Sequence, residues 1–250
     1  GETVLPPLSL PFSLVVARVQ ANDIVILSEQ EEILHLASGT LTDTVFAGEQ
    51  LNLTSFSLTM GDSILRGHGT LLTNTQYRVN ARLEADLHLQ GYEAITATAQ
   101  ATGPLNALQV VADMKSPQSI HLDGELRDLL GTTTWSATFQ AEEIHLTAFN
   151  PDWPSQIFRQ ATVQSQGTLE EYSLVIDAAT GLPGLAQPVA LKAEIQGNGQ
   201  GMQFSKLHLG QNKAALSAQG SLQWQPHLTW QADIQGTDLD PSVFFAEWPG

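Results

Sequence analysis

Apolar and polar residues alternate along most of the chain. The clearest run covers residues 77–89, where one side carries Tyr77, Val79, Ala81, Leu83, Ala85, Leu87 and Leu89. The residues between them are arginine, asparagine, glutamate, aspartate and histidine. Successive side chains of a β-strand point to opposite faces, so this period of two predicts a long, half-buried strand.

The same alternation predicts strands over almost all of the remaining sequence. They are expected at 14–19, 24–27, 33–36, 40–46, 51–60, 63–72, 105–114, 119–126, 132–139, 144–148, 161–169, 172–178, 189–196, 204–209, 214–224 and 228–234. Within 51–60 the apolar register changes between Leu53 and Phe56, which predicts a β-bulge near Thr54 and Ser55. Helix is expected only as short capped turns, at 151–158 and 241–246.

Two kinds of internal repeat indicate an array. The tripeptide Gly-x-Leu recurs within alternating segments, beginning at Gly39, Gly69, Gly124, Gly167 and Gly220. A glycine on an apolar face marks close packing by a neighbour. A longer repeat relates Trp135 to Trp230 and Trp153 to Trp248, each pair 95 residues apart. Matching tracts at one offset favour a stacked array over a closed globule.

No composition break marks a domain boundary. Residues 1–250 are therefore expected to form one continuous β-groove segment cut from a longer array, with a loose joint at 181–188. So many strands with one apolar face either pack as a sandwich or fold lengthwise into a trough. We expect an all-β, elongated, repeat-like fold with little helix.

Composition excludes several classes of partner and site. With 10 basic and 26 acidic residues the net charge is −16, so the chain has no field that attracts nucleic acid or anionic headgroups. The absence of cysteine excludes disulfides, thiolate metal sites and cysteine nucleophiles. No apolar run is long enough for a membrane-spanning helix, so any membrane anchor is expected outside this chain.

A search for catalytic chemistry finds no motif. The seven histidines have no metal-ligand spacing, and no nucleophile elbow or phosphate-binding glycine loop is present. The glycines at 197, 199 and 201 are expected to form a turn. We expect the adjacent Glu142 and Glu143 to lie in a solvated hairpin loop rather than to form an acid–base pair. We therefore expect no enzyme activity, no metal and no cofactor.

The repeat carries a resemblance to a known family. The pattern Gly220-Ser-Leu222, Leu228-Thr-Trp-Gln-Ala-Asp-Ile234, Leu239-Asp-Pro241 and Trp248-Pro-Gly250 resembles tracts along the TamB family of translocation and assembly module subunits, whose style AsmA-like proteins share. The opening at 10–26 is similar to the segment that follows the N-terminal region of that family. The resemblance identifies the chain as an internal segment of such a protein.

The resemblance implies a β-taco, a lengthwise-folded sheet with an apolar groove, in the periplasm of a Gram-negative bacterium. It implies a parent anchored in the inner membrane, a TamA-like outer-membrane barrel partner bound through a region outside this chain, and a role in phospholipid transport and outer-membrane protein assembly. The expected partners of this segment are phospholipid acyl chains.

The inward positions of the predicted strands are the candidate groove lining. They are Val79, Ala81, Leu83, Leu87, Leu89, Phe139, Leu174, Ile176, Leu191, Ile195, Leu216, Leu228, Trp230 and Ile234. Alternation alone does not separate an open groove from a packed core. The alternative function is therefore a structural β-array, such as an adhesin or autotransporter stalk, with a dry core and a protein-binding outer face.

Overall fold

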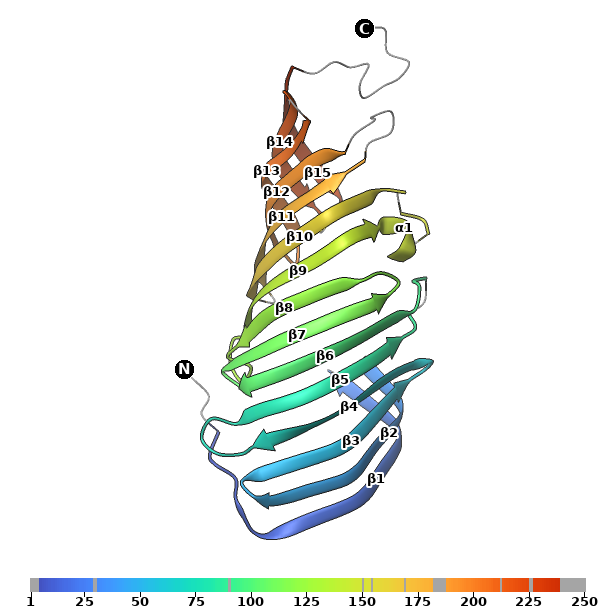
Figure 1. Ribbon diagram of the computed structural model, residues 1–250, viewed down its shortest axis with the longest axis vertical. Coiled ribbons are helices and arrows are strands. Elements are labelled where there is room, and N and C mark those ends of the chain that lie inside the picture. Colours follow the sequence, from blue (N-terminus) through green and yellow to red (C-terminus); the bar gives the residue numbers. More distant parts are fainter. Residues whose placement is uncertain are drawn as a thin grey trace. The chain divides into compact units, whose positions relative to one another are not determined.

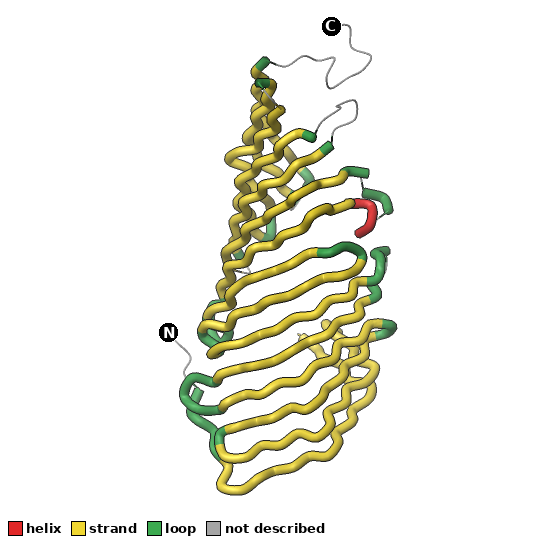
Figure 2. Tube along the Cα trace, in the orientation of Figure 1, coloured by secondary structure: helices red, strands yellow, loops and turns green. Residues whose placement is uncertain are grey.

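The chain is an all-β protein built on one open antiparallel sheet. The computed structural model describes residues 5–28, 31–89, 91–149, 151–153, 155–168, 170–181, 188–211, 213–224 and 227–238. Fifteen strands of these residues follow one another in the sheet in their sequence order, without closing into a barrel. Figure 2 shows strand along nearly the whole described chain, interrupted by the short helix α1 (Leu146–Phe149). The predicted fold class is confirmed.

The strands fall into two compact units. Unit 1 comprises residues 1–117 and 123–132, and unit 2 comprises 118–122 and 133–250. Unit 1 contains β1 (Leu10–Ser28), β2 (Glu31–Gly48), β3 (Gln50–Met60), β4 (Ser63–Leu72), β5 (Arg78–Leu87), β6 (Ile95–Pro104) and β7 (Ala107–Ser116). Unit 2 contains β9 (Thr134–His145), β10 (Ile157–Thr168), β11 (Glu171–Thr180), β12 (Val189–Asn198), β13 (Gly201–Gln211), β14 (Ala214–Gln223) and β15 (Thr229–Thr237). Strand β8 (Ile120–Arg127) has residues in both units.

Each unit is a meander of neighbouring strands, which Figure 1 traces from β1 to β7 and from β9 to β15. Short turns, such as Gly61–Asp62 between β3 and β4, join antiparallel neighbours and bring the same face of the chain back into register. The predicted loose joint at 181–188 lies mostly outside the described residues, since 182–187 are not described.

Register shifts interrupt the pairing of β3 with β4 in unit 1 and of β13 with β14 in unit 2. The predicted bulge in β3 is confirmed: the pairing with β4 shifts between Leu53 and Phe56. There the Thr54 hydroxyl donates a 2.8 Å hydrogen bond to the carbonyl of Asp43, which has a left-handed backbone with φ of 50°. A bulge lets one strand turn while keeping its apolar residues on one face.

Unit 2 repeats this arrangement in β13. The pairing of β13 with β14 shifts between Phe204 and Leu207, and the Ser205 hydroxyl donates to the carbonyl of Glu194 at 3.4 Å. As in β3, a hydroxyl side chain at the bulge donates a hydrogen bond to a backbone carbonyl of the preceding strand. The register change restores Leu207 to the face that carries Phe204, so both bulges preserve the apolar face.

Several predicted boundaries need correction. The segments predicted at 14–19 and 24–27 belong to one strand, β1, and those at 33–36 and 40–46 belong to β2. Strand β6 was not predicted, because its Ile-Thr-Ala-Thr-Ala-Gln-Ala sequence alternates mainly between alanine and threonine. Strand β5 ends at Leu87 rather than at residue 89.

Three further boundaries concern the helical turns and β9. Residues 146–148 form part of α1 and not of a strand, and the helical turn lies there rather than at 151–158. The turn predicted at 241–246 lies outside the described residues. The pair Glu142 and Glu143 lies within β9, not in a hairpin loop.

Few side chains of the described residues are fully buried. The buried hydrophobic ones are Leu36, Leu108, Ala161, Ala178, Val189 and Ala193. Most of the other apolar side chains of the described strands are half-buried.

Candidate functional site: the apolar face of the sheet

In unit 2 the strand register assembles the apolar residues into rows. A row is here a set of directly paired residues that crosses the strands. The central row contains Phe139, Val163, Ile176, Ala193, Leu207, Ala218 and Ile234. The rows on either side contain Ala137, Ser165, Leu174, Ile195, Phe204, Gly220 and Ala232, and Ala178, Leu191, Leu209, Leu216 and Gly236. Together these rows form the apolar face of unit 2.

Unit 1 carries a matching apolar face. One row contains Val19, Leu41, Phe56, Gly67, Leu83, Ala99 and Ala112. Another contains Leu14, Phe46, Leu51, Leu71, Val79 and Gly103. The side chains of this face are smallest on β6, which contributes Ala97, Ala99 and Ala101 between Ile95 and Gly103.

Glycines accommodate the large side chains of this face. A side chain at Gly67 would meet Phe56 Cε1 at 2.7 Å, and one at Gly220 would meet Phe204 Cζ at 2.6 Å. A side chain at Gly197 would meet the ring of Tyr172. Aromatic residues thus lie over glycines of the adjacent strand, which fills the space that a glycine leaves in a sheet. The close packing expected of Gly220 is confirmed.

The structure groups most of the predicted lining residues. Val79, Ala81, Leu83 and Leu87 share one face of β5, and all are half-buried. In unit 2 the rows join Phe139, Ile176 and Ile234, then Leu174 and Ile195, then Leu191 and Leu216. Trp230 lies in the row that begins with Trp135 on β9, so the repeat-related tryptophans share one row.

Leu89 and Leu228 lie outside the strands. Leu89 follows the end of β5 and is 50% exposed, and Leu228 precedes β15 and is 71% exposed. Neither belongs to a row of the described strand pairs. The candidate lining left out Phe56, Val163 and Leu207, which the rows place on the apolar face. The register change at Thr54 was the signal that could have added Phe56.

Apolar side chains at the outer strands are the most exposed. On β15, Trp230 is 75% and Ile234 is 63% exposed, and on β1 Leu14 is 48% and Val19 is 45% exposed. Each of these strands pairs on one side only among the described residues. The apolar face therefore presents accessible hydrophobic surface, of the kind that marks interaction sites for apolar partners.

The opposite face of the sheet is polar and ionic. Asp177 and Lys192 are direct cross-strand neighbours 3.3 Å apart, and Glu194 and Lys206 are 3.6 Å apart. All four side chains are more than half exposed, so these pairs contribute little stability. They show instead that the alternate positions of the strands face water.

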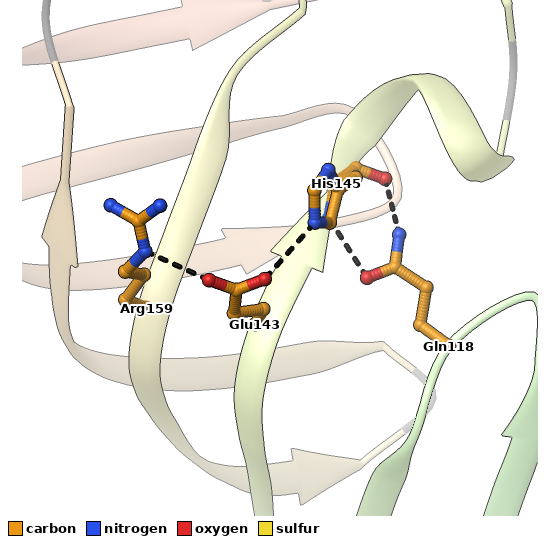
Figure 3. Close-up of polar contacts among 4 residues, drawn as sticks. All are labelled: Gln118, Glu143, His145 and Arg159. Carbon is orange, nitrogen blue, oxygen red and sulfur yellow. Dashed lines mark hydrogen bonds and ion pairs between the residues drawn. The ribbon is translucent and has the colours of Figure 1, made fainter.

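Figure 3 shows a polar cluster where β9 ends. Arg159 Nε donates to Glu143 Oε1 at 2.8 Å, and the other carboxylate oxygen lies 3.3 Å from His145 Nε2. These contacts, that of Arg159 foremost, lower the pKa of Glu143 below its ordinary value. In the same way, Arg127 lowers the pKa of Glu125 in unit 1.

The same cluster also terminates β9. The carboxamide of Gln118 accepts from the backbone N–H of His145 at 2.9 Å and donates to its carbonyl at 2.7 Å (Figure 3). A side-chain amide thus supplies both hydrogen bonds that a neighbouring strand would make. Because every member has a structural partner, we assign this cluster to strand termination and not to catalysis.

The described residues offer no obvious centre for chemistry. Among them, no three His, Asp or Glu side chains gather in a way that could hold a metal ion. In the part of the chain that the structure describes, no helix has the length and apolar character needed to cross a membrane. The arrangement that stands out is the accessible apolar face itself.

Comparison with known proteins gives a family. The family model described as TamB, N-terminal domain, matches residues 2–250. The search of curated proteins and the search of solved structures found no match. The match covers almost the whole chain and agrees with the resemblance in the repeat tracts. The chain belongs to the TamB family.

Proposed function

We propose that this chain is a periplasmic segment of a bridge-like protein whose apolar face shields the acyl chains of phospholipids in transit between the inner and outer membranes. Membership of the TamB family supports an envelope role in transport or assembly rather than catalysis. The parent protein would be anchored in the inner membrane of a Gram-negative bacterium, and a TamA-like barrel partner would bind a region outside this chain.

The observation that carries the proposal is the continuity of the apolar rows within each unit, together with the partial exposure of many of their large side chains. Leu83 in unit 1, and Ile176 and Ile195 in unit 2, lie within such rows and are half-buried. An acyl chain laid on such a surface removes its CH₂ groups from water, at about 0.8 kcal/mol for each group fully buried. A lining of aliphatic side chains lacks directional bonds that would hold a lipid in one place.

The polar face supports the same division of roles. Glu84 lies next to Leu83 and Asp177 next to Ile176, and both acidic residues are exposed. Lipid headgroups would stay in water while the tails contact the apolar face. Transport of lipid and assembly of outer-membrane proteins would then share one surface, which suits acyl chains and the apolar side of a nascent barrel strand.

Site-specific photo-crosslinking in cells tests the proposal. The probe is placed at Leu83, Ile176 or Ile195 of the full-length parent, with Glu84 and Asp177 as matched outward controls, and adducts are identified by mass spectrometry. We expect phospholipid adducts at the inward positions only. Crosslinks from the inward positions to neighbouring strands alone would contradict the proposal and favour the scaffold with a dry core.

A further inference from the structure

A second candidate site lies at one end of the strands of unit 2. A hollow of about 820 Å³ crosses the ends of β9 to β14. Its lining includes Gln166, Ser173, Gln196, Gln203 and Ser221. These five residues are direct neighbours in successive strand pairs, so they form one continuous row. They alternate along their strands with residues of the apolar face, and the row therefore belongs to the polar face.

Two tight turns hold one end of this hollow. The Thr168 hydroxyl accepts hydrogen bonds from the backbone N–H groups of Glu170 and Glu171, at 3.2 and 3.1 Å. The Asn198 side-chain oxygen accepts from the N–H groups of Gln200 and Gly201, at 2.9 and 3.0 Å. Side chains that cap their own turns fix the backbone locally. The lining is thus held before any ligand arrives.

Apart from Trp135, Tyr172 and Met202, which share one row, the lining is largely uncharged and hydrogen-bonding. Glutamine, asparagine, serine and threonine supply most of it, Glu171 is its one carboxylate, and none of the lining residues is Lys, Arg or His. Carboxamides offer both donors and acceptors, and hydroxyls do the same. With a chain charge of −16 and no cation in the hollow, an anionic ligand would be repelled.

An aromatic ring stands beside the hollow. Trp224, which follows the lining residue Gln223, donates from its indole Nε1 to the carbonyl of Gly199 at 2.9 Å. Its backbone N–H also donates a hydrogen bond to the carbonyl of Gln200, so two hydrogen bonds hold the tryptophan against the turn at 198–201. The side chain remains 37% exposed. A fixed, accessible indole next to amide and hydroxyl groups suits a ligand with both apolar ring faces and hydroxyls.

We propose that this hollow binds a neutral oligosaccharide, extended across the strands from Gln166 to Ser221. Neighbouring strands are about 4.8 Å apart, similar to the length of one sugar unit in an extended β-linked glycan. Each strand would then present one amide or hydroxyl to each sugar unit. The hollow has the size of ordinary ligand sites, which run from about 300 to 1,000 Å³. This proposal does not depend on lipid binding.

Calorimetry and amide NMR of the full chain test this site. The probes are tetra-N-acetylchitotetraose and cellotetraose, and the readout is the side-chain NH₂ signals of the lining glutamines. The test variant combines Gln196→Ala with Gln203→Ala. The matched control combines Gln231→Ala with Gln235→Ala, two exposed glutamines of β15 outside the hollow. Circular dichroism verifies that both variants fold.

We expect saturable shifts of the lining amides with at least one sugar, and binding weakened by about tenfold or more in the test variant but not in the control. Equal weakening in both variants would overturn the proposal, as would unchanged lining signals at the highest soluble sugar concentration. Preferential binding of an uncharged extended peptide over both sugars would overturn it too and would assign the hollow to polypeptide.

Discussion

The ring of Phe56 on β3 occupies the space where a side chain at Gly67 on β4 would stand. A Cβ at Gly67 would lie 2.7 Å from Phe56 Cε1, and also 2.6 Å from the backbone carbonyl oxygen of Arg82. The ring could rotate away, but the carbonyl belongs to the β4–β5 ladder and could not. Contacts with both neighbouring strands, β3 and β5, therefore require a glycine at position 67.

Gly67→Ala is expected to lower the free energy of unfolding by about 1–3 kcal/mol, because it overpacks a fixed backbone contact. Urea denaturation followed by circular dichroism measures the effect. Gly199→Ala is the control, since nothing lies within 4 Å of the added methyl group there. Equal stability of the two variants would show that β4 can shift to admit a side chain.

Thr54→Val tests the hydrogen bond across the β3 bulge. The substitution keeps the branched shape and removes the hydroxyl that bonds the Asp43 carbonyl. We expect a loss of about 0.5–1 kcal/mol, the lower range for one hydrogen bond, because the contact is exposed. Urea midpoints are compared with those of Thr102→Val, an exposed β6 threonine. No difference between the variants would mean that the bulge persists without the bond.

Leu83→Arg is expected to impair outer-membrane integrity in cells, because it places a charge in the middle of an apolar row. Glu84→Arg, one position along the same strand, should leave integrity unchanged since it faces water. Sensitivity to detergents and large antibiotics provides the measurement, with the amount of parent protein checked by immunoblotting. Wild-type resistance in the Leu83 variant, at normal protein levels, would argue against a transport role for this row.

Glu143 should titrate at a lower pH than an isolated glutamate, because Arg159 and His145 both favour its charged form. A lowered folded-state pKa stabilises the fold above the unfolded pKa, and this stabilisation disappears as the pH falls through the folded value. Carbon-detected NMR of the side-chain carboxyl measures the pKa. Arg159→Gln should raise it toward the ordinary value, whereas Lys192→Gln should not. An unchanged pKa in the Arg159 variant would remove the arginine as the cause.

Alternation of residue types was sufficient to predict most strands and the two faces. It located the bulge at Thr54 because the apolar phase changes visibly there, from Leu53 to Phe56. It did not predict β6, where alanine and threonine differ too little in hydrophobicity to show a period. It also extended β5 to Leu89, because the pattern continues after hydrogen bonding stops.

The rows could be predicted only in part. Alternation assigns Phe139 and Ile234 to the same face, but their common row depends on the register of five intervening strands. The polar hollow was not predicted, since glutamines at 166, 196 and 203 are separated in sequence and look like any solvated positions. Only the pairing of β10 to β14 brings them together.

The meander also determines how each unit can be assembled. Among the described residues, neighbouring strands of the sheet are consecutive in the chain, so no pairing within a unit has to wait for a distant segment. Short loops cost little closure entropy, and local contacts favour fast folding. A chain that emerges gradually during synthesis could therefore add one hairpin at a time, each new strand using the previous one as its template.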